Sequence, residues 1–292
     1  MGPAVTESQD AISKARVRRA AARAVRYATV SLRPLPDFVI LGTQRGGTTS
    51  LYRWLASHPN VAPASEKEVH YFDVQYHRGE RWYRTHFPTR SPGQITGEST
   101  PYLLFHPLAP QRVARDLPDT TKFVVLLRDP TQRAISQYWH VRRQGDREPE
   151  SLERAMELEP QRLATETDQF VRGEPSPEYL LHSYMARGEY APQLHRWFDA
   201  VGRERILVLE SERLFADPAA SQEVLDWLGL PPHTRRYPVT NGAPRLEEAS
   251  AELADRLDAH FAPHNEELFA LLGRKLWSGV DGIASPGATP AR

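Results

Sequence analysis

The stretch Asp37-Phe-Val-Ile-Leu-Gly42-Thr-Gln-Arg-Gly-Gly47-Thr-Thr-Ser50 decides the fold of this 292-residue chain. Its apolar run at 38–41 ends in glycine, which is typical of a buried parallel strand. A glycine-rich turn follows, and apolar residues then recur at helical spacing over 51–55. Such a turn directs several backbone N–H groups toward one point, where the helix N-terminus adds positive potential. The stretch therefore predicts an α/β fold with an anion site, for which phosphate is the usual ligand.

Strands and helices continue to alternate along the rest of the chain. Strands are predicted at 95–98, 122–127 and 205–210, and helical spacing is found from 130 and at 151–159, 178–201, 218–229, 246–261 and 264–272. Strands that alternate with helices form a parallel sheet covered by helices on both faces. We predict a P-loop-like three-layer α/β/α domain with a central parallel sheet over residues 36–280, followed by a flexible tail at 281–292.

Residues 1–35 differ from this pattern. Arginines 16, 19, 23 and 26 are spaced so that they share one face of a helix, and most of the residues between them are alanine or valine. We predict a basic helical arm. A solvated helix is favoured over contact with an acidic surface or a membrane, because the apolar face is mostly alanine.

Composition excludes several classes of protein. Lys+Arg and Asp+Glu both number 37, and this balance argues against a dedicated nucleic-acid binder. The chain has no cysteine, which excludes disulfides and thiolate chemistry. No apolar run is long enough to span a bilayer, and the first residues lack a secretory pattern. We expect a cytoplasmic protein without stable membrane insertion; the sequence does not indicate an oligomeric state.

The glycine loop differs from the nucleoside-triphosphate loop G-x-x-x-x-G-K-[ST] at one decisive position. Gly42, Gly47 and Thr49 are in register, but Thr48 replaces the lysine that balances the charge of the β- and γ-phosphates. Arg45 supplies a cation three residues earlier. The loop is therefore expected to bind phosphate without serving as an ATPase, the alternative being a tight turn that merely requires glycine.

A second phosphate element follows the strand at 122–127. Arg128 leaves this strand, and Ser136 lies about two turns into the next helix. Because parallel strands end at the same edge of a sheet, this pair should lie near the glycine loop. An arginine and a hydroxyl suit a second phosphate, whereas alone they would indicate a surface ion pair or a helix cap. Together the two elements predict a nucleotide with phosphates on both sides of its ribose.

These residues resemble motifs of the PAPS-dependent sulfotransferases, PAPS being 3′-phosphoadenosine 5′-phosphosulfate. Residues 42–50 resemble the phosphosulfate-binding loop and 128–136 the 3′-phosphate motif of that family. The resemblance extends over 36–277 through His58-Pro59 and segments 68–73, 98–102, 188–197 and 263–274. It is similar to the heparan-sulfate-type branch, the glucosaminyl N- and 3-O-sulfotransferases, rather than to the phenol and steroid enzymes.

The resemblance implies PAPS as the co-substrate. We expect no metal, because sulfate carries less charge than a γ-phosphate and the sequence shows no Asp/His cluster with ligand spacing. The residues implied in donor binding are Arg45, Gly46, Gly47, Thr48, Thr49, Ser50, Arg128, Ser136 and Arg245. Arg45 stands where the family usually has a lysine that contacts the bridging oxygen of the donor. Its planar guanidinium keeps the charge but has a different shape.

The resemblance also implies that Glu68 is the catalytic base. A carboxylate can serve as the base if burial beside Tyr71 and Phe72 raises its pKa toward neutrality. His70 would share the face of Glu68 if the segment is extended, and could orient it or assist proton transfer. The residues that we expect to bind the acceptor are Glu68, His70, Asp73, Ser99 and Tyr102. Ser99 stands where heparan-sulfate-type relatives often have lysine.

The sequence thus predicts a sulfotransferase. It would move a sulfuryl group from PAPS to a hydroxyl, in preference to an amine, of a glycan, glycolipid or secondary metabolite and release adenosine 3′,5′-bisphosphate. Two alternatives stay open. Arg45 and Ser99 would suit a non-catalytic nucleotide-binding module. A small-molecule kinase could also use the glycine loop, although Thr48 argues against it.

Overall fold

A computed structural model of the chain describes residues 21, 24–233, 235–237 and 249–277. Within these residues, a sheet of five parallel strands runs through the molecule in the order β2-β3-β1-β4-β5. The strands are β1 (Phe38–Gly42), β2 (Val61–Pro63), β3 (Ile95–Ser99), β4 (Lys122–Leu127) and β5 (Ile206–Glu210). Four of them were predicted. The sequence analysis missed β2, a three-residue edge strand too short to show a periodic pattern.

The helices connect these strands and extend beyond their ends. The α-helices are α2 (Thr48–Ala56), α3 (Gly79–Arg84), α4 (Ala109–Asp116), α5 (Pro130–Arg142), α6 (Leu152–Ala164), α7 (Thr167–Arg172), α8 (Pro177–Leu181), α9 (Tyr190–Val201), α10 (Ser211–Ala216), α11 (Pro218–Leu228) and α12 (Ala251–Leu272). Short 3-10 turns are η1 (Val30–Leu32), η2 (Tyr76–Arg78), η3 (Ala186–Gly188) and η4 (Arg203–Arg205). None of the described helices is both long and apolar enough to cross a bilayer.

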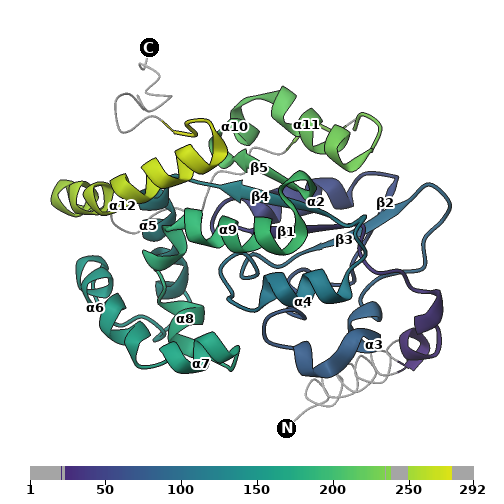
Figure 1. Cartoon of the computed structure of the whole chain (residues 1–292), viewed down its shortest axis with the longest axis horizontal. Coiled ribbons are helices and arrows are strands. Elements are labelled where there is room, and N and C mark those ends of the chain that lie inside the picture. The colour runs from purple at the N-terminus through teal and green to yellow at the C-terminus, as the bar shows by residue number, and fades with distance from the viewer. Residues whose placement is uncertain (1–20, 22–23, 234, 238–248, 278–292) are drawn as a thin grey trace, which may run out of the picture.

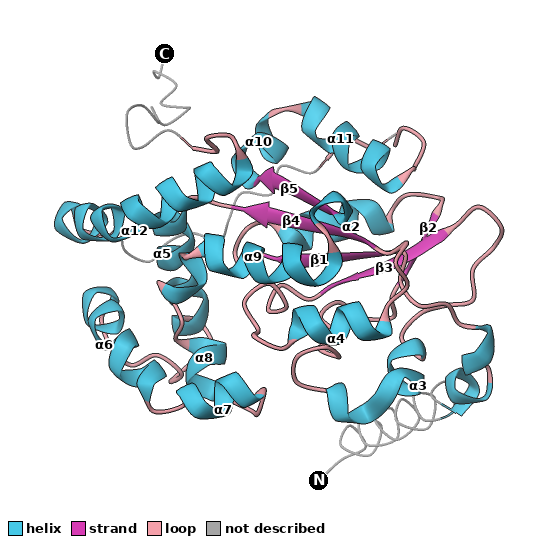
Figure 2. Ribbon diagram, viewed as in Figure 1, coloured by secondary structure: helices cyan, strands magenta, loops and turns pink. Residues whose placement is uncertain are grey.

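The sheet is buried on both faces, as its apolar strands predict. Successive residues of a strand point to opposite faces, so Val39 and Leu41 pack with α4 and α9, whereas Phe38 and Ile40 pack with α2, α10 and α11. Figure 2 shows the sheet between these helices. The predicted three-layer α/β/α arrangement is confirmed. Trp197 of α9 is fully buried against the sheet, which makes that helix a main support of the core.

Strand order places a binding crevice at the centre of the sheet. From β1 the chain passes to β2 and β3 on one side, then returns to β4 and β5 on the other. Parallel sheets bind ligands at such a switch point, beyond the carboxyl ends of the strands. The glycine loop follows β1, Arg128 follows β4, and Ser99 ends β3. The fold therefore gathers the predicted motifs at one edge.

Helices α5, α6 and α12 form a further apolar cluster beyond this edge, in which Tyr184 also takes part (Figure 1). The sequence analysis predicted two helices, at 246–261 and 264–272, but α12 runs through Pro263 without a break. Proline removes one helical hydrogen bond. Burial of Leu253, Leu257, Phe261 and Leu268 holds the helix together on both sides of it.

The predicted helix at 178–201 is also wrong as a single element. The chain instead forms α8, a turn with η3, and then α9. Gly188 ends η3 within this turn, and a Cβ there would lie 2.7 Å from the ring of Phe261. The chain at Gly188 passes so close to α12 that a side chain could not be accommodated without a shift.

Residues preceding β1 contact the domain. Arg26 Nη1 donates to Ser65 Oγ at 3.1 Å, and Arg33 Nη1 donates to the Phe87 carbonyl oxygen at 2.5 Å. Both arginines belong to the predicted basic arm at 1–35. The rest of that arm before residue 24, apart from residue 21, lies outside the described residues, as does the predicted tail at 281–292. The proposed boundaries of these segments stay predictions.

Candidate functional site

The glycine loop forms an anion cradle at the start of α2. Gly47 has a left-handed backbone with φ of 86°, and a Cβ there would lie 2.7 Å from the Phe215 ring. A Cβ on Gly46 would lie 2.8 Å from the Leu126 carbonyl oxygen. Both positions therefore require glycine. The N–H groups of Thr48 and Thr49 open the first turn of α2, ahead of the first hydrogen bonds to the N-cap, which Ser50 and Leu51 donate to the Gly47 carbonyl oxygen.

Hydrogen bonds fix this loop to the sheet and to α10. The Thr43 N–H donates to the Leu126 carbonyl oxygen at 2.8 Å, and Ser211 Oγ donates to the Gly46 carbonyl oxygen at 2.5 Å. Thr48, which stands in place of the usual lysine, is buried. The loop is thus held rigidly, and its positive charge comes from another residue.

Arg45 supplies that charge and joins the two predicted phosphate elements. Its Nε donates to Ser136 Oγ at 3.1 Å, and its carbonyl oxygen accepts a 3.4 Å hydrogen bond from Arg128 Nη1. Its backbone is left-handed, with φ of 70°, a strained conformation for a residue with a Cβ. The structure therefore brings the glycine loop, Arg128 and Ser136 into direct contact, as the strand geometry predicts.

Positive charge accumulates around Arg45. Burial, followed by the cations Arg143, Arg128 and Arg133, lowers the pKa of its guanidinium. Arg128 also faces a carboxylate, with its Nε 3.4 Å from Glu212 Oε1, and burial raises the pKa of that carboxyl. Like charges gathered at a helix N-terminus are stabilised when an anion binds between them.

The sequence analysis missed Arg143, although a signal for it exists. Arg143 follows Ser136 by seven residues, which is two turns of α5, so the two lie on the same helix face. The spacing of 136, 140 and 143 could have identified this face as part of the donor site.

Glu68, His70 and Asp73 form a chain of charged groups. His70 Nδ1 lies 2.7 Å from Asp73 Oδ2, and His70 Nε2 lies 3.7 Å from Glu68 Oε2. The Asp73 carboxylate is fully buried, whereas 43% of the Glu68 side chain is exposed. Lys67 Nζ also donates to Glu68 Oε1. This row of interacting side chains thus runs from the buried Asp73 carboxylate through His70 to the Glu68 carboxylate, which is accessible to solvent.

The backbone of this segment differs from the extended form that we considered. Glu68 and His70 are left-handed, with φ of 62° and 55°. The Glu68 N–H donates to the Ser99 carbonyl oxygen at 3.0 Å, at the end of β3. His70 reaches Glu68 because the chain turns here, and not because the two share one face of a strand. Strained non-glycine residues of this kind concentrate at functional sites.

The condition of a raised pKa is not met at Glu68 in the free protein. Burial alone would raise this pKa, but His70 and Lys67 outweigh burial and lower it to about 2. Burial likewise opposes a charged His70, but hydrogen bonds with Asp73 and Glu68 raise its pKa to about 10. At neutral pH the free site therefore holds a Glu68 carboxylate between two cations. Sequence reasoning counted the apolar neighbours and missed Lys67.

His140 interacts with both the cation cluster around Arg45 and the carboxylate of Glu68. Burial, followed by Arg45 and Arg143, lowers the pKa of its imidazole, while Glu68 acts in the opposite direction. A residue of α5 thus lies within electrostatic range of both the cation cluster and the Glu68 carboxylate. The donor residues and the candidate base face the same region.

Ser99 and Tyr102 lie deeper than a substrate contact would require. Ser99 is fully buried at the end of β3, and its Oγ finds no hydrogen-bond partner among the described residues. Tyr102 is 7% exposed, and the Arg187 guanidinium lies 4.7 Å from its ring centre. Their direct contact with an acceptor stays a prediction. Arg245 lies outside the described residues.

Arg187 is a support of the site that the sequence did not indicate. It is almost fully buried, and its Nη1 donates to Gln44 Oε1 in the glycine loop. Its Nη2 donates to the carbonyl oxygens of Tyr179 and Leu180, at 2.6 and 2.8 Å. Arg187 therefore connects the loop to the chain around α8. Only the tertiary fold brings these residues together.

Comparison with known proteins identifies the family. The model of the sulfotransferase domain matches residues 35–242, which is most of the chain and includes both phosphate elements. This chain belongs to the sulfotransferase family. A solved sulfotransferase from Alicyclobacillus acidocaldarius has a similar fold, with a TM-score of 0.66 and 28% identity; the match covers 83% of this chain and 98% of that one. The family resemblance inferred from the sequence is confirmed.

Curated relatives belong to the heparan sulfate branch of this sulfotransferase family. The chain is 34% identical over 197 residues to heparan sulfate glucosamine 3-O-sulfotransferase 3B1 of Mus musculus, a match that covers 67% of this chain and 46% of the relative. It is 30% identical over 267 residues to the 3-O-sulfotransferase 6 of the same species, which covers 83% of this chain and 73% of that relative. The match to the first relative thus spans about half of that protein's length.

Proposed function

We propose that this sulfotransferase-family protein transfers a sulfuryl group from PAPS to an acceptor hydroxyl. The contact between Arg45 and Ser136 carries the proposal, because it joins the loop for the 5′ end of the donor to the element for its 3′-phosphate. A nucleotide with phosphates at both positions fits such a pair, and adenosine 3′,5′-bisphosphate is the product. Thr48 in place of lysine argues against ATP as the nucleotide.

Each group of the site has a role in this reaction. Glu68 accepts the proton of the acceptor hydroxyl as the oxygen forms its bond to sulfur. The bond between sulfur and the bridging phosphate oxygen breaks, and its electron pair stays on that oxygen. Arg45 and the first N–H groups of α2 stabilise the charge that develops there. Arg128 and Ser136 hold the 3′-phosphate through charge-assisted and hydroxyl hydrogen bonds.

The low pKa of Glu68 fits this role once the donor is considered. With a pKa of about 2 in the free protein, the carboxylate is a weak base held by Lys67 and His70. A bound donor brings several negative charges to the same region, and nearby like charges raise the pKa of a carboxyl. Lys67, which is partly exposed, can also turn toward the donor. Donor binding would thereby activate the base.

The acceptor that we propose is a hydroxyl of a glycan or glycolipid. Glu68 is 43% exposed, so a large acceptor can reach its carboxylate without entering a closed pocket. The curated relatives are named for 3-O-sulfation of glucosamine in heparan sulfate, which is transfer to a sugar hydroxyl. Ser99 in place of a lysine common in that branch favours an acceptor with less negative charge.

The Glu68→Gln variant tests the assignment. Glutamine keeps the shape but cannot accept the proton, so transfer of radioactive sulfate from labelled PAPS should fall by about 10²–10⁴-fold. Affinity for adenosine 3′,5′-bisphosphate, measured by calorimetry, should stay within a few-fold of the parent value. Glu174→Gln is the matched control, because Glu174 is an exposed carboxylate that pairs with Arg172, which is not one of the site residues.

An acceptor panel of neutral oligosaccharides, sulfated oligosaccharides, glycolipids and amino sugars completes the test. Transfer that Glu68→Gln abolishes supports the proposal, and analysis of the product distinguishes an O-sulfate from an N-sulfate. Bisphosphate binding without transfer to any acceptor would favour the non-catalytic module. Unchanged turnover in Glu68→Gln would overturn Glu68 as the base.

A further inference from the structure

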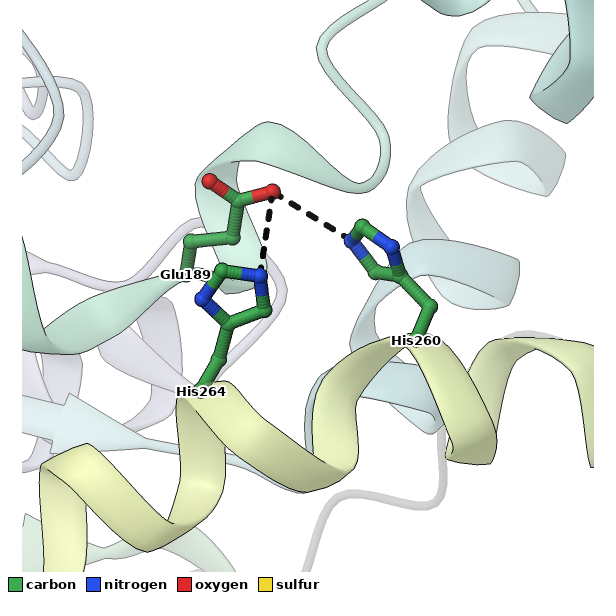
Figure 3. Close-up of side chains that lie close together, drawn as sticks. All are labelled: Glu189, His260 and His264. Atoms are coloured by element: carbon green, nitrogen blue, oxygen red, sulfur yellow. Dashed lines mark ion pairs between the residues drawn. The ribbon is translucent and has the colours of Figure 1, made fainter.

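A second cluster of charged and metal-binding side chains lies outside the donor site. Glu189 precedes α9, and His260 and His264 lie on α12. Figure 3 shows both imidazole rings directed at the same carboxylate. Nε2 of His260 is 3.3 Å from Glu189 Oε1, and Nε2 of His264 is 3.8 Å from it. One ligand atom from each residue falls within 4.8 Å of the other two.

The sequence explains why two of these side chains meet. His260 and His264 are four residues apart, so one continuous helix places them one above the other on the same face. The sequence analysis divided this region into two helices and missed the pairing. Because α12 continues through Pro263, their ring centres lie only 5.3 Å apart.

Close packing brings the carboxylate to this helix face. Gly188, which precedes Glu189, lies so near α12 that an added Cβ would be 2.7 Å from Phe261. Phe261 in turn follows His260 along the chain. The contact between Gly188 and Phe261 therefore sets Glu189 beside His260. The cluster is therefore positioned by the packing of two buried neighbours, although its own three side chains are partly exposed.

The hydrogen bonding of His260 indicates a missing ligand. Within the part of the chain that the structure describes, its Nε2 is shielded from solvent and makes no hydrogen bond. Glu189 Oε1 is 3.3 Å away but outside hydrogen-bond geometry. A shielded nitrogen that makes no hydrogen bond has a cost in free energy, which a metal ion between the nitrogen and the carboxylate would remove.

We propose that Glu189, His260 and His264 bind a divalent zinc-like metal ion. Ligand atoms about 2.0–2.2 Å from a tetrahedral zinc ion lie about 3.3–3.6 Å from one another. The separations of 3.3 and 3.8 Å match this arrangement with small adjustments of the side chains. Two imidazoles and one carboxylate suit zinc, whereas magnesium prefers oxygen ligands alone. All three side chains are partly exposed, so water can fill the fourth position.

The metal would connect α12 to the segment that supports the donor site. Arg187, two residues before Glu189, donates to Gln44 of the glycine loop. Tyr190, the next residue after Glu189, donates from its hydroxyl to the Arg128 carbonyl oxygen at 2.8 Å. A zinc ion held by Glu189 and α12 would therefore stabilise the backbone that positions both phosphate elements. Its role is structural, since none of its ligands is among the donor residues.

The test is zinc titration of the untagged full-length chain, because a histidine tag would itself bind zinc. The protein is treated with a chelator, desalted and titrated with zinc chloride in a calorimeter at pH 7.5. We expect one zinc per chain and a rise in melting temperature of several °C with excess zinc. Magnesium chloride should give neither effect. Cobalt substitution should give the visible absorption of a low-coordinate site.

Two variants assign the site, and one serves as a matched control. His264→Ala and Glu189→Gln should each weaken zinc binding at least tenfold while circular dichroism stays unchanged, since both side chains are about one-third exposed. His195→Ala removes an exposed histidine of the adjacent α9 and should bind zinc as the parent protein does. Absence of stoichiometric zinc binding, or equal binding in all three variants, would overturn the proposal.

Discussion

Glu68 and His70 show how a functional residue can contradict its sequence context. Their neighbours Tyr71 and Phe72 are apolar and buried, which predicts a carboxyl with a raised pKa. The left-handed turns at Glu68 and His70 instead place the Glu68 carboxylate against both His70 and Lys67. The result is an ion pair in which the base is strongly ionised and the imidazole is protonated.

This ion pair predicts a particular pH dependence of stability. The pKa of His70 is raised from 6.5 to about 10, so its contribution is complete below pH 6.5 and is lost as the pH rises toward 10. The pKa of Glu68 is lowered from 4.5 to about 2, so its contribution is present above pH 4.5 and is lost as the pH falls toward 2. The difference in melting temperature between the parent protein and His70→Gln should be largest from pH 4.5 to 6.5.

The control for this pH series is His77→Gln, which changes an exposed histidine of η2. Its melting temperature should follow that of the parent protein across the whole range. A difference between parent and His70→Gln that stays constant from pH 6.5 to 10 would contradict the assigned pKa of His70.

Replacing Arg45 should reduce donor affinity more than replacing Ser136, whose hydroxyl accepts a hydrogen bond from Arg45. A hydrogen bond to a charged group contributes about 1.5–3 kcal/mol, and a neutral one about 0.5–1.5 kcal/mol. Arg45→Ala should therefore weaken binding of adenosine 3′,5′-bisphosphate by about 10- to 100-fold, and Ser136→Ala by less than about tenfold. Calorimetry at constant ionic strength measures both. Equal small effects would remove Arg45 from the donor site.

At the scale of elements, the turn between β1 and α2 is limited by space as well as by backbone conformation. Gly47 has φ of 86° and would place a Cβ 2.7 Å from Phe215. Gly93 has a similar φ of 79° but open space around it. A comparison of the two positions therefore distinguishes the effect of backbone strain from that of steric overlap.

Gly47→Ala should be clearly more destabilising than Gly93→Ala. Strain alone costs about 1–2 kcal/mol at either position, and overlap with Phe215 adds about 1–3 kcal/mol at Gly47. Urea unfolding measures the two free energies. Only Gly47→Ala should also weaken bisphosphate binding, because it displaces the start of α2. Equal unfolding free energies would mean that Phe215 can move aside.

Element boundaries also show where sequence reasoning ends. The strands β1, β4 and β5 were predicted because each contains a short apolar run, whereas β3, with the sequence Ile-Thr-Gly-Glu-Ser, has only a weak strand pattern. Helix α12 was divided at Pro263, because local propensity cannot show that buried residues on both sides hold the helix together. The turn between α8 and α9 contains Gly188, whose close neighbour Phe261 is distant in sequence and therefore gives no local signal.

At the scale of the whole molecule, the sequence predicted which motifs meet but not which charges surround them. Alternating elements predicted a parallel sheet whose strands end at the same edge, and this placed Arg45, Arg128 and Ser136 together there. The contact of Arg187 with Gln44 arises only in the folded chain, since 143 positions separate the two residues. The sequence therefore did not predict charged residues, such as Arg187, that reach the site only through tertiary packing.

Ligand-dependent stability tests the whole donor site at once. A ligand present at about 100 times its dissociation constant adds about 2.7 kcal/mol to the unfolding free energy. Adenosine 3′,5′-bisphosphate should therefore raise the melting temperature by several °C without added metal. ADP should raise it less, because it lacks a 3′-phosphate for Arg128. Stabilisation by ATP with Mg²⁺ alone would favour the kinase alternative.

The pairing of Arg128 with Glu212 has a consequence for selectivity. Before the donor arrives, Arg128 already faces a carboxylate with its Nε 3.4 Å away, and Arg45 is engaged by Ser136. A small inorganic anion must compete with each of these internal partners alone. A nucleotide that carries phosphates on both sides of one ribose displaces the two partners in a single binding event. Glu212 and Ser136 thus compete with incoming anions for Arg128 and Arg45. This competition would weaken the binding of simple inorganic anions and keep the site available for the donor.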